Sequence, residues 1–146
     1  MKNANHATTV NFLATNGVSD AKQVREITSG FDLDQPVYER LVQPGERLYQ
    51  FIRNSDMHRP VPGTGNWFCI SGATMDSLAI FSGAAGRHLV EFTVSYPVLS
   101  LEGTASALKR AGNWAGGGRG GSTQIYLPRQ ALFALTARGT HLQERG

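Results

Sequence analysis

Cysteine, charge and long hydrophobic runs are all scarce in this sequence of 146 residues. The single cysteine, Cys69, excludes an internal disulfide and a cysteine-rich zinc site, and its apolar neighbours favour a small buried thiol over a nucleophile. No hydrophobic run reaches the roughly 18 residues of a membrane-spanning helix, and the polar start MKNANHATTV lacks the apolar region of a secretory signal. Charged residues make up 17% of the chain, too few for a charge-driven disordered protein. We therefore expect one globular domain.

Histidines are few, and none has the spacing of a metal site. None of the four stands at i, i+4 from another metal-ligand side chain, so no metal centre is predicted. His58 beside Arg59 and His88 beside Arg87 could serve acid–base catalysis on RNA, or could be ordinary surface or strand-end residues. No pair of carboxylates stands out, which leaves two-carboxylate glycoside chemistry without support.

The net charge is weakly positive. Fourteen Lys and Arg residues against eleven Asp and Glu residues give +3. This balance allows an anionic partner such as a dinucleotide, RNA or an acidic protein, and does not identify one.

The start of the chain divides into a polar stretch and two predicted helices. Residues 1–19 are rich in Asn, Thr and Ala without clear periodicity, and we interpret them as a loose arm or the end of a linker before a single domain over 20–146. Ser19-Asp20 is typical of a helix cap and precedes the segment AKQVREIT. The segment 36–42 begins with proline and predicts a second short helix.

From residue 46 the pattern becomes strand-like. In ERLYQFIR, Leu48, Gln50 and Ile52 alternate with residues of the opposite face, which predicts a strand. Further short strands are expected in NWFCI, HLVEFTVSY, VLSLEG, TQIYLP, ALFAL and THLQ, and one helix in SGATMDSLAIFSG. The predicted fold class is α+β, with N-terminal helices packed on about six short strands.

A glycine-rich run separates two of these strands. The segment 111–122 holds six glycines, and no regular element survives that density. It is not a phosphate-binding P-loop, because the required lysine is missing and a strand follows instead of a helix. The run could be a flexible hairpin connection, or a loop that lets a ligand approach the backbone closely.

The order of four segments carries a family resemblance. ERLYQFIR, WFCISGATMDSLAIFSG, HLVEFTV and GGSTQIYLP follow one another as in the ADP-ribosyltransferase fold family of bacterial toxins. The last segment resembles the GGGTQY-type ending of the tuberculosis necrotising toxin family, whose members hydrolyse NAD. The resemblance covers about residues 45–143 and implies a catalytic domain with a split core of short strands.

The resemblance also implies a set of site residues. Gln124 stands at the family's third motif and Ser71 at the second. The first motif departs from the family, because Gln50 occupies the expected arginine position and the nearby arginines alternate to the other face. The implied catalytic residues are Gln124, Arg53 and Ser71, and the implied substrate-binding residues are Arg47, Tyr49, Gln50, Trp67, Phe68, Gly121 and Ser122.

Gln124 bears on the choice of reaction. An amide can hydrogen-bond a ribose hydroxyl but does not titrate in the useful range, so it cannot prepare a protein acceptor as a glutamate would. This favours hydrolysis of NAD+ or NADP+ as substrate, with no separate cofactor or metal. The alternatives are a mono-ADP-ribosyltransferase modifying a protein or RNA and, from other classes, a basic ribonuclease toxin or a non-catalytic binding module.

The family also implies a partner and a destination. Such domains form part of secreted effectors, act in the cytoplasm of a target cell and are neutralised by a cognate immunity protein. A basic toxin domain would suit an acidic inhibitor. Neither a membrane nor, for the favoured reaction, a nucleic acid is expected as partner.

Overall fold

Two helices, seven strands and a short 3-10 helix make up the described chain. The computed structural model describes residues 1–53, 65–75, 77–78, 87–107 and 120–141, with the backbone alone for the last four. The helices and strands are α1 (Lys2–Thr15), α2 (Ala21–Thr28), β1 (Tyr38–Val42), β2 (Arg47–Arg53), β3 (Trp67–Cys69), β4 (Arg87–Val94), β5 (Val98–Thr104), β6 (Thr123–Tyr126), the 3-10 helix η2 (Arg129–Ala134) and β7 (Leu135–His141).

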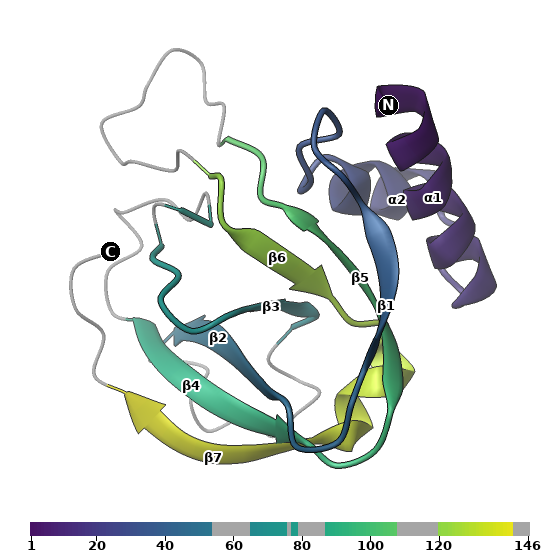
Figure 1. Cartoon of the computed structure of the whole chain (residues 1–146). Coiled ribbons are helices and arrows are strands. Elements are labelled where there is room, and N and C mark those ends of the chain that lie inside the picture. The colour runs from purple at the N-terminus through teal and green to yellow at the C-terminus, as the bar shows by residue number, and fades with distance from the viewer. Residues whose placement is uncertain (54–64, 76, 79–86, 108–119, 142–146) are drawn as a thin grey trace.

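The strands form one antiparallel sheet in the order β1-β5-β6-β3-β2-β4-β7. β3 lies between two halves of the sheet, with β6 on one side and β2 on the other (Figure 1). It pairs with β6 over three residues but with β2 through a single register pair, Tyr49 with Cys69. We call this junction the β2–β3 seam.

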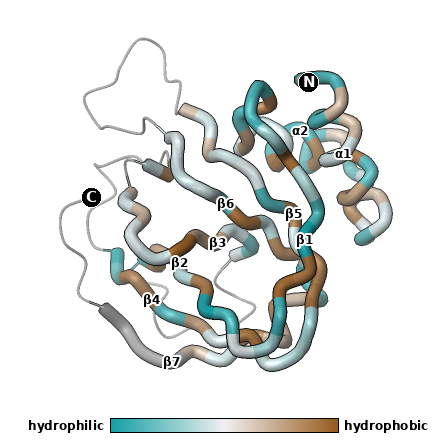
Figure 2. The backbone as a smooth tube through the Cα atoms, in the orientation of Figure 1, coloured by the Kyte–Doolittle hydropathy of each residue, from teal (hydrophilic) through white to brown (hydrophobic). Residues whose placement is uncertain are grey.

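The two faces of the sheet are covered differently. Residues in register share a face, so Leu48, Phe92, Phe68 and Ile125 point to one side, which we call the inner face. They pack with residues of η2 in the main hydrophobic core. The hydrophobic colour in Figure 2 is accordingly concentrated on strands such as β3 and β6. On the outer face, α1 and α2 pack over β5 and β6 (Figure 1), and Met75 and Leu78 pack over Phe51 of β2 and Cys69 of β3.

The N-terminal stretch is a helix, so the prediction of a loose arm over residues 1–19 was wrong. α1 buries Asn5, Thr9, Phe12 and Leu13, which lie at i, i+4, i+7 and i+8 on one helix face. Because half of this face is polar, the sequence lacks the helical spacing of hydrophobic residues that would indicate a buried helix. The Asn5 amide donates to the carbonyls of Leu33 and Gln35, both at 2.8 Å, and so replaces apolar contact with hydrogen bonds.

The second predicted helix, over residues 36–42, is also wrong, because Tyr38–Val42 form the edge strand β1. β1 pairs with β5 over five residues and places Val42 in the core. Arg40 fixes the pairing through its guanidinium, which donates to Glu102 at 2.7 Å and to Glu46 at 2.8 Å. These partners lie 62 and 6 residues away, so local sequence preference could not reveal them.

Other predicted elements are confirmed or corrected in detail. α2 begins where expected, and the Asp20 carboxylate caps it by accepting from the Gln23 N–H at 3.0 Å. The strands of ERLYQFIR, NWFCI, HLVEFTVSY, VLSLEG and TQIYLP are confirmed as β2 to β6. ALFAL is mostly the 3-10 helix η2 instead of a strand.

The α+β class is confirmed, with seven strands in the described chain instead of about six. A helix was expected over SGATMDSLAIFSG. Its described residues, 71–75 and 77–78, form turns and irregular backbone instead, and residues 76 and 79–83 lie outside the described chain. Most of the glycine-rich run, 111–119, also lies outside it. No helix among the described residues has the length and apolarity to cross a membrane.

Candidate functional site

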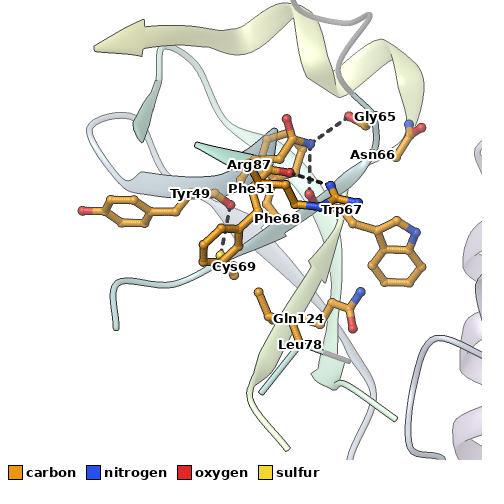
Figure 3. A pocket seen from close by; sticks show the side chains of 11 residues that line it. Tyr49, Phe51, Gly65, Asn66, Trp67, Phe68, Cys69, Leu78, Arg87 and Gln124 are labelled. Carbon is orange, nitrogen blue, oxygen red and sulfur yellow. Dashed lines mark hydrogen bonds between the residues drawn. The ribbon is translucent and has the colours of Figure 1, made fainter. Parts of the chain in front are cut away.

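A pocket of about 250 Å³ opens at the β2–β3 seam (Figure 3). Since β2 and β3 share one register pair, the strands diverge on the Trp67 side of that pair and leave space between them. The pocket is lined by Tyr49, Gln50, Phe51, Gly65, Asn66, Trp67, Phe68, Cys69, Leu78, Arg87 and Gln124.

Side chains replace the missing strand-to-strand hydrogen bonds at the seam. The Gln50 amide nitrogen donates to the carbonyl of Trp67 at 3.0 Å and to that of Gly65 at 3.3 Å. From the other side, the Arg87 guanidinium donates to the carbonyl of Phe51 at 3.3 Å. Figure 3 draws these bonds as dashed lines around the pocket. Carbonyls without a strand partner need other donors, and Gln50 and Arg87 provide them where the strands diverge.

Gln124 reaches the pocket from β6. It stands in register with Cys69, so its side chain shares the outer face with Cys69 and Tyr49. The backbone before β6 is held by Gly120 and Gly121, both with positive φ. A side chain at Gly120 would come within 2.5 Å of the Ala105 carbonyl oxygen, so only glycine fits this approach. Part of the glycine-rich run therefore serves to deliver Gln124 to the pocket.

Trp67 forms an aromatic wall of the pocket and is itself braced by the helical layer. Its indole meets Phe31 and Tyr126 edge to face, with ring centroids 5.2 and 5.3 Å apart. Its far edge lies so close to Gly30 that an added side chain there would sit 3.0 Å from the ring. The ring is thus fixed before any ligand arrives, as a rigid binding wall requires.

Phe68 and Tyr49 occupy different environments along the same pocket. The Phe68 ring turns to the inner face, is only 2% exposed and meets Phe92 edge to face at 5.7 Å. Phe68 therefore contributes to the wall from within the core. Tyr49 is half-buried on the outer face and packs against the cluster of Phe51, Cys69 and nearby apolar residues.

Arginines gather at the end of β2 next to the pocket. Arg53 stands in register with Arg87 of β4, so the two side chains share the outer face. Arg87 lines the pocket, whereas Arg53 is exposed beside it. Two cations side by side on neighbouring strands form a local positive field suited to a phosphate or diphosphate.

Several residues suggested by the sequence lie outside the pocket lining. Arg47 is at the opposite end of β2, where it lies 3.5 Å from Glu91. Ser71 is exposed in the turn after β3, and Gly121 and Ser122 belong to the backbone that precedes β6. The Ser122 N–H donates to the Ser77 carbonyl at 2.9 Å, which ties this backbone to the turn that holds Ser77.

Sequence reasoning missed Arg87, Asn66 and Leu78 as lining residues. In the sequence, Arg87 stands out only as a neighbour of His88. The available signal was the position of Arg87 at the start of a strand whose partner begins and ends with arginine. Asn66 donates from its side chain to the Leu127 carbonyl at 2.9 Å and so fixes the start of β3.

Cys69 is a buried thiol, as expected. It is 1% exposed, and its S–H donates to the Tyr49 carbonyl at 3.3 Å. Burial raises the pKa of Cys69 to about 12. The thiol therefore stays protonated at physiological pH and is no nucleophile.

No carboxylate or imidazole lines the pocket among the described residues. His88 stands in register with Ile52 and so points to the inner face, away from Gln124. His58, the other histidine considered for acid–base catalysis, lies outside the described residues. The side-chain groups of the described pocket lining are thus amides, a guanidinium, a thiol, the phenol of Tyr49 and other aromatic and aliphatic groups.

Three solved structures share this fold. The structure of Tse6 in complex with Tsi6 matches with a TM-score of 0.73 and 20% identity, over 94% of this chain and 96% of the matched chain. The structure of Tne2 in complex with Tni2 matches with a TM-score of 0.60 and 15% identity, over 77% and 96%. Rhs1-CT in complex with its cognate immunity protein RhsI1 matches with a TM-score of 0.54 and 16% identity, over 80% and 86%.

At these identities the likeness establishes a common fold. The sequence itself matches no protein-family model and no curated protein.

Proposed function

We propose that this chain is a bacterial toxin domain that hydrolyses NAD+ or NADP+ to nicotinamide and ADP-ribose or its phosphate. The observation that carries the proposal is the meeting of Gln124, Trp67 and Arg87 in one pocket at the β2–β3 seam. The fold shared with Tse6, Tne2 and Rhs1-CT, each solved in complex with a partner, supports the toxin assignment. The proposed architecture is ADP-ribosyltransferase-like, with the seam as the split of its core.

The pocket offers what cleavage of the nicotinamide–ribose bond requires. The bond between the ring nitrogen and the ribose C1′ breaks, its electron pair leaves with neutral nicotinamide, and C1′ acquires oxocarbenium character. Water adds to C1′ and releases a proton to solvent. Gln124 would hold a ribose hydroxyl, Trp67 would exclude water from the nicotinamide, and Arg87 with Arg53 would balance the diphosphate. NAD(P)+ is the substrate, and no separate cofactor enters the proposal.

The side chains of the described pocket lining favour hydrolysis over transfer to a protein, because none of them is a carboxylate that could act as a base. Water needs little activation to attack a near-cation, whereas a protein nucleophile usually needs a base. The described lining residues offer no carboxylate for that task, and Gln124 does not titrate. A ribonuclease would need acid–base groups, and the described imidazole of His88 points to the other face.

The test is direct. Purified protein is mixed with NAD+ or NADP+ at neutral pH, and nicotinamide and ADP-ribose (phosphate) are both measured. We expect equal amounts of the two products and a loss of at least about a hundredfold in Gln124→Ala, the scale of removing one oriented donor. Gln130→Ala, at an exposed position of η2, is the matched control and should keep full activity.

Two other outcomes would contradict hydrolysis. Release of nicotinamide only when lysate is added, with ADP-ribose bound to a macromolecule, would identify a transferase. No consumption of either dinucleotide under any condition would remove both activities and turn attention to RNA cleavage or binding.

We also propose an immunity protein as partner and the target-cell cytoplasm as the site of action. The complex of Rhs1-CT with a cognate immunity protein supports the first part, and the positive charge of this chain favours an acidic partner. Co-expression of the immunity protein should then restore the growth of cells that make the toxin domain. An immunity protein that binds without restoring growth would contradict the idea.

A further inference from the structure

Gly103 lies inside β5, where a glycine weakens the strand unless something needs the space of its missing side chain. It does not have the positive φ that would itself demand glycine. A Cβ at this position would lie 2.7 Å from Cδ1 and 3.0 Å from Cε1 of the Phe31 ring. Phe31 is only 3% exposed. Gly103 therefore leaves the space that the buried Phe31 ring occupies.

The backbone around Phe31 is fixed to the same end of β5. The Asp32 N–H donates to the Thr104 carbonyl at 2.8 Å, and the Ser106 N–H donates to the Gly30 carbonyl at 3.0 Å. Because these hydrogen bonds lie on either side of Phe31, its backbone cannot move away from β5 without losing one of them. We therefore expect a clash at the ring to be passed on to the side chains around it.

The aromatic neighbour of Phe31 is Trp67. The two rings meet edge to face, with centroids 5.2 Å apart. Gly103 belongs to β5 and Trp67 to β3, and β6 lies between these strands, so Phe31 connects two strands that are not neighbours. Tyr126 and the backbone of Gly30 lie against other parts of the indole. A push from Phe31 should thus move the indole toward the pocket that it lines.

We propose that Phe31, in the space left by Gly103, is a positioning residue that fixes the Trp67 indole for the nicotinamide of bound NAD(P)+. The inference rests on the proposed function, because it takes Trp67 as the wall on which the nicotinamide ring packs. Neither Phe31 nor Gly103 is among the described residues that line the pocket. They act through Trp67, so one methyl group added at residue 103 should weaken substrate binding without touching the substrate.

The effect should fall on KM and leave kcat in place. A wall that packs on the nicotinamide holds the ring in the substrate complex and in the transition state alike. Loss of such uniform binding raises KM with kcat unchanged. A role in the stability of the fold alone would change neither constant in a variant that remains folded.

The first experiment measures steady-state hydrolysis of NAD+ by Gly103→Ala. We expect KM to rise by about two- to tenfold, the range that one aromatic contact supplies. The kcat should stay within about twofold of that of the unaltered protein. Leu99→Ala, at a 46% exposed position on the same strand and face, is the control and should change neither constant.

A double variant shows whether the methyl group acts through Phe31. Phe31→Ala removes the ring with which the added methyl group would clash. The KM of Gly103→Ala with Phe31→Ala should therefore be no higher than that of Phe31→Ala alone. Additive increases in KM would overturn the route through Phe31.

A spectroscopic measurement decides the matter where Gly103→Ala fails to fold. Trp114 is the other tryptophan of the chain, so fluorescence in a Trp114→Phe background reports Trp67 alone. We expect its anisotropy to decay only with the tumbling of the domain. Phe31→Leu, which keeps an apolar side chain without the ring, should add a decay on the picosecond to nanosecond timescale of free side chains. A fast decay with Phe31 in place, or none in Phe31→Leu, would overturn the inference.

The outcomes separate the inference from the proposed function. If NAD+ is hydrolysed and folded Gly103→Ala has an unchanged KM, the role of Phe31 is overturned and the hydrolase stands. If NAD+ is not consumed, the hydrolase falls, and the anisotropy alone decides whether Phe31 positions Trp67.

Discussion

Arg53 of β2 and Arg87 of β4 lie directly opposite each other in the antiparallel register and project from the same face of the sheet. Like charges in this arrangement repel, which lowers the stability of the free protein. Arg87 lines the pocket, so an anion bound there would sit beside both guanidiniums. An anion at that position would offset the repulsion between the two side chains.

Arg53→Gln should therefore separate stability from substrate binding. Removing one charge relieves the repulsion, and we expect the free energy of unfolding to rise by about 0.2–1 kcal/mol. The KM for NAD+ should rise several-fold because the diphosphate loses a cation. Chemical denaturation and steady-state kinetics measure the two effects, with Arg129→Gln on the exposed end of η2 as control. An unchanged KM would mean that the pair does not serve the substrate.

Gln124→Glu should give hydrolysis a dependence on pH that the native residue does not. An amide does not ionise, whereas a glutamate ordinarily titrates near pH 4.3. The variant should lose activity as the pH falls from about 6 to about 4 and its carboxylate becomes protonated. Rates of nicotinamide release, each normalised to its value at neutral pH, make the comparison. Parallel profiles for the two proteins would argue that residue 124 does not touch the reacting sugar.

Cys69 should report on the folded state at alkaline pH. Burial raises the pKa of its thiol to about 12, whereas the unfolded thiol titrates near 8.5. The unfolded state thus loses its proton first, so the free energy of unfolding falls as the pH rises above about 8.5. Denaturation between about pH 8.5 and 9.5, below the ordinary tyrosine range, should show this slope in the native protein and not in Cys69→Ala.

The same thiol should resist chemical modification. At about pH 8 the folded state holds roughly a thousandfold less thiolate than the unfolded state, because its pKa is about 12 instead of about 8.5. Reaction with a thiol reagent should then proceed through unfolding. Rapid labelling under conditions where the protein remains folded would show that Cys69 is accessible.

Gly120→Ala and Gly121→Ala should differ although the two residues are adjacent. Both have positive φ, so alanine at either position costs about 1–2 kcal/mol of stability. At Gly121 the added methyl group would meet nothing within 4 Å, whereas at Gly120 it would lie 2.5 Å from the Ala105 oxygen and 2.7 Å from the Ser106 oxygen. We expect Gly120→Ala to lose at least about 1 kcal/mol more. Equal unfolding free energies would contradict the close approach.

The strands were the most predictable part of the fold, because their side chains alternate. ERLYQFIR separates Leu48 and Ile52 from Tyr49 and Phe51 with a period of two, and the structure places these pairs on opposite faces. α1 escaped prediction because Asn5 and Thr9 occupy half of its buried face. The Asn5 amide donates to the carbonyls of Leu33 and Gln35, about 30 positions away, and a local pattern does not contain such partners.

The site was predictable in part. Gln124, Trp67 and Tyr49 could be named from motif order, and all three line the pocket. Arg87 could not be named, because its position at the pocket results from the pairing of β2 with β4. The sequence of one strand does not show which distant strand it pairs with. Gln50 departs from the motif in the sequence, and only the geometry reveals that its amide donates to the carbonyls of Gly65 and Trp67.

The single register pair between β2 and β3 has a mechanical consequence. The strands on either side of the seam are joined by the register pair of Tyr49 with Cys69 and by the side chain of Gln50, which donates to the carbonyls of Gly65 and Trp67. Such a junction has few bonds to break, so we expect it to open more readily than the longer strand pairings described above. A ligand that contacts both β2 and β3 would add contacts between the two parts of the sheet. Binding of such a ligand would raise the free energy of unfolding of the domain. Resistance to heat and to proteolysis would then report how much of the pocket is filled.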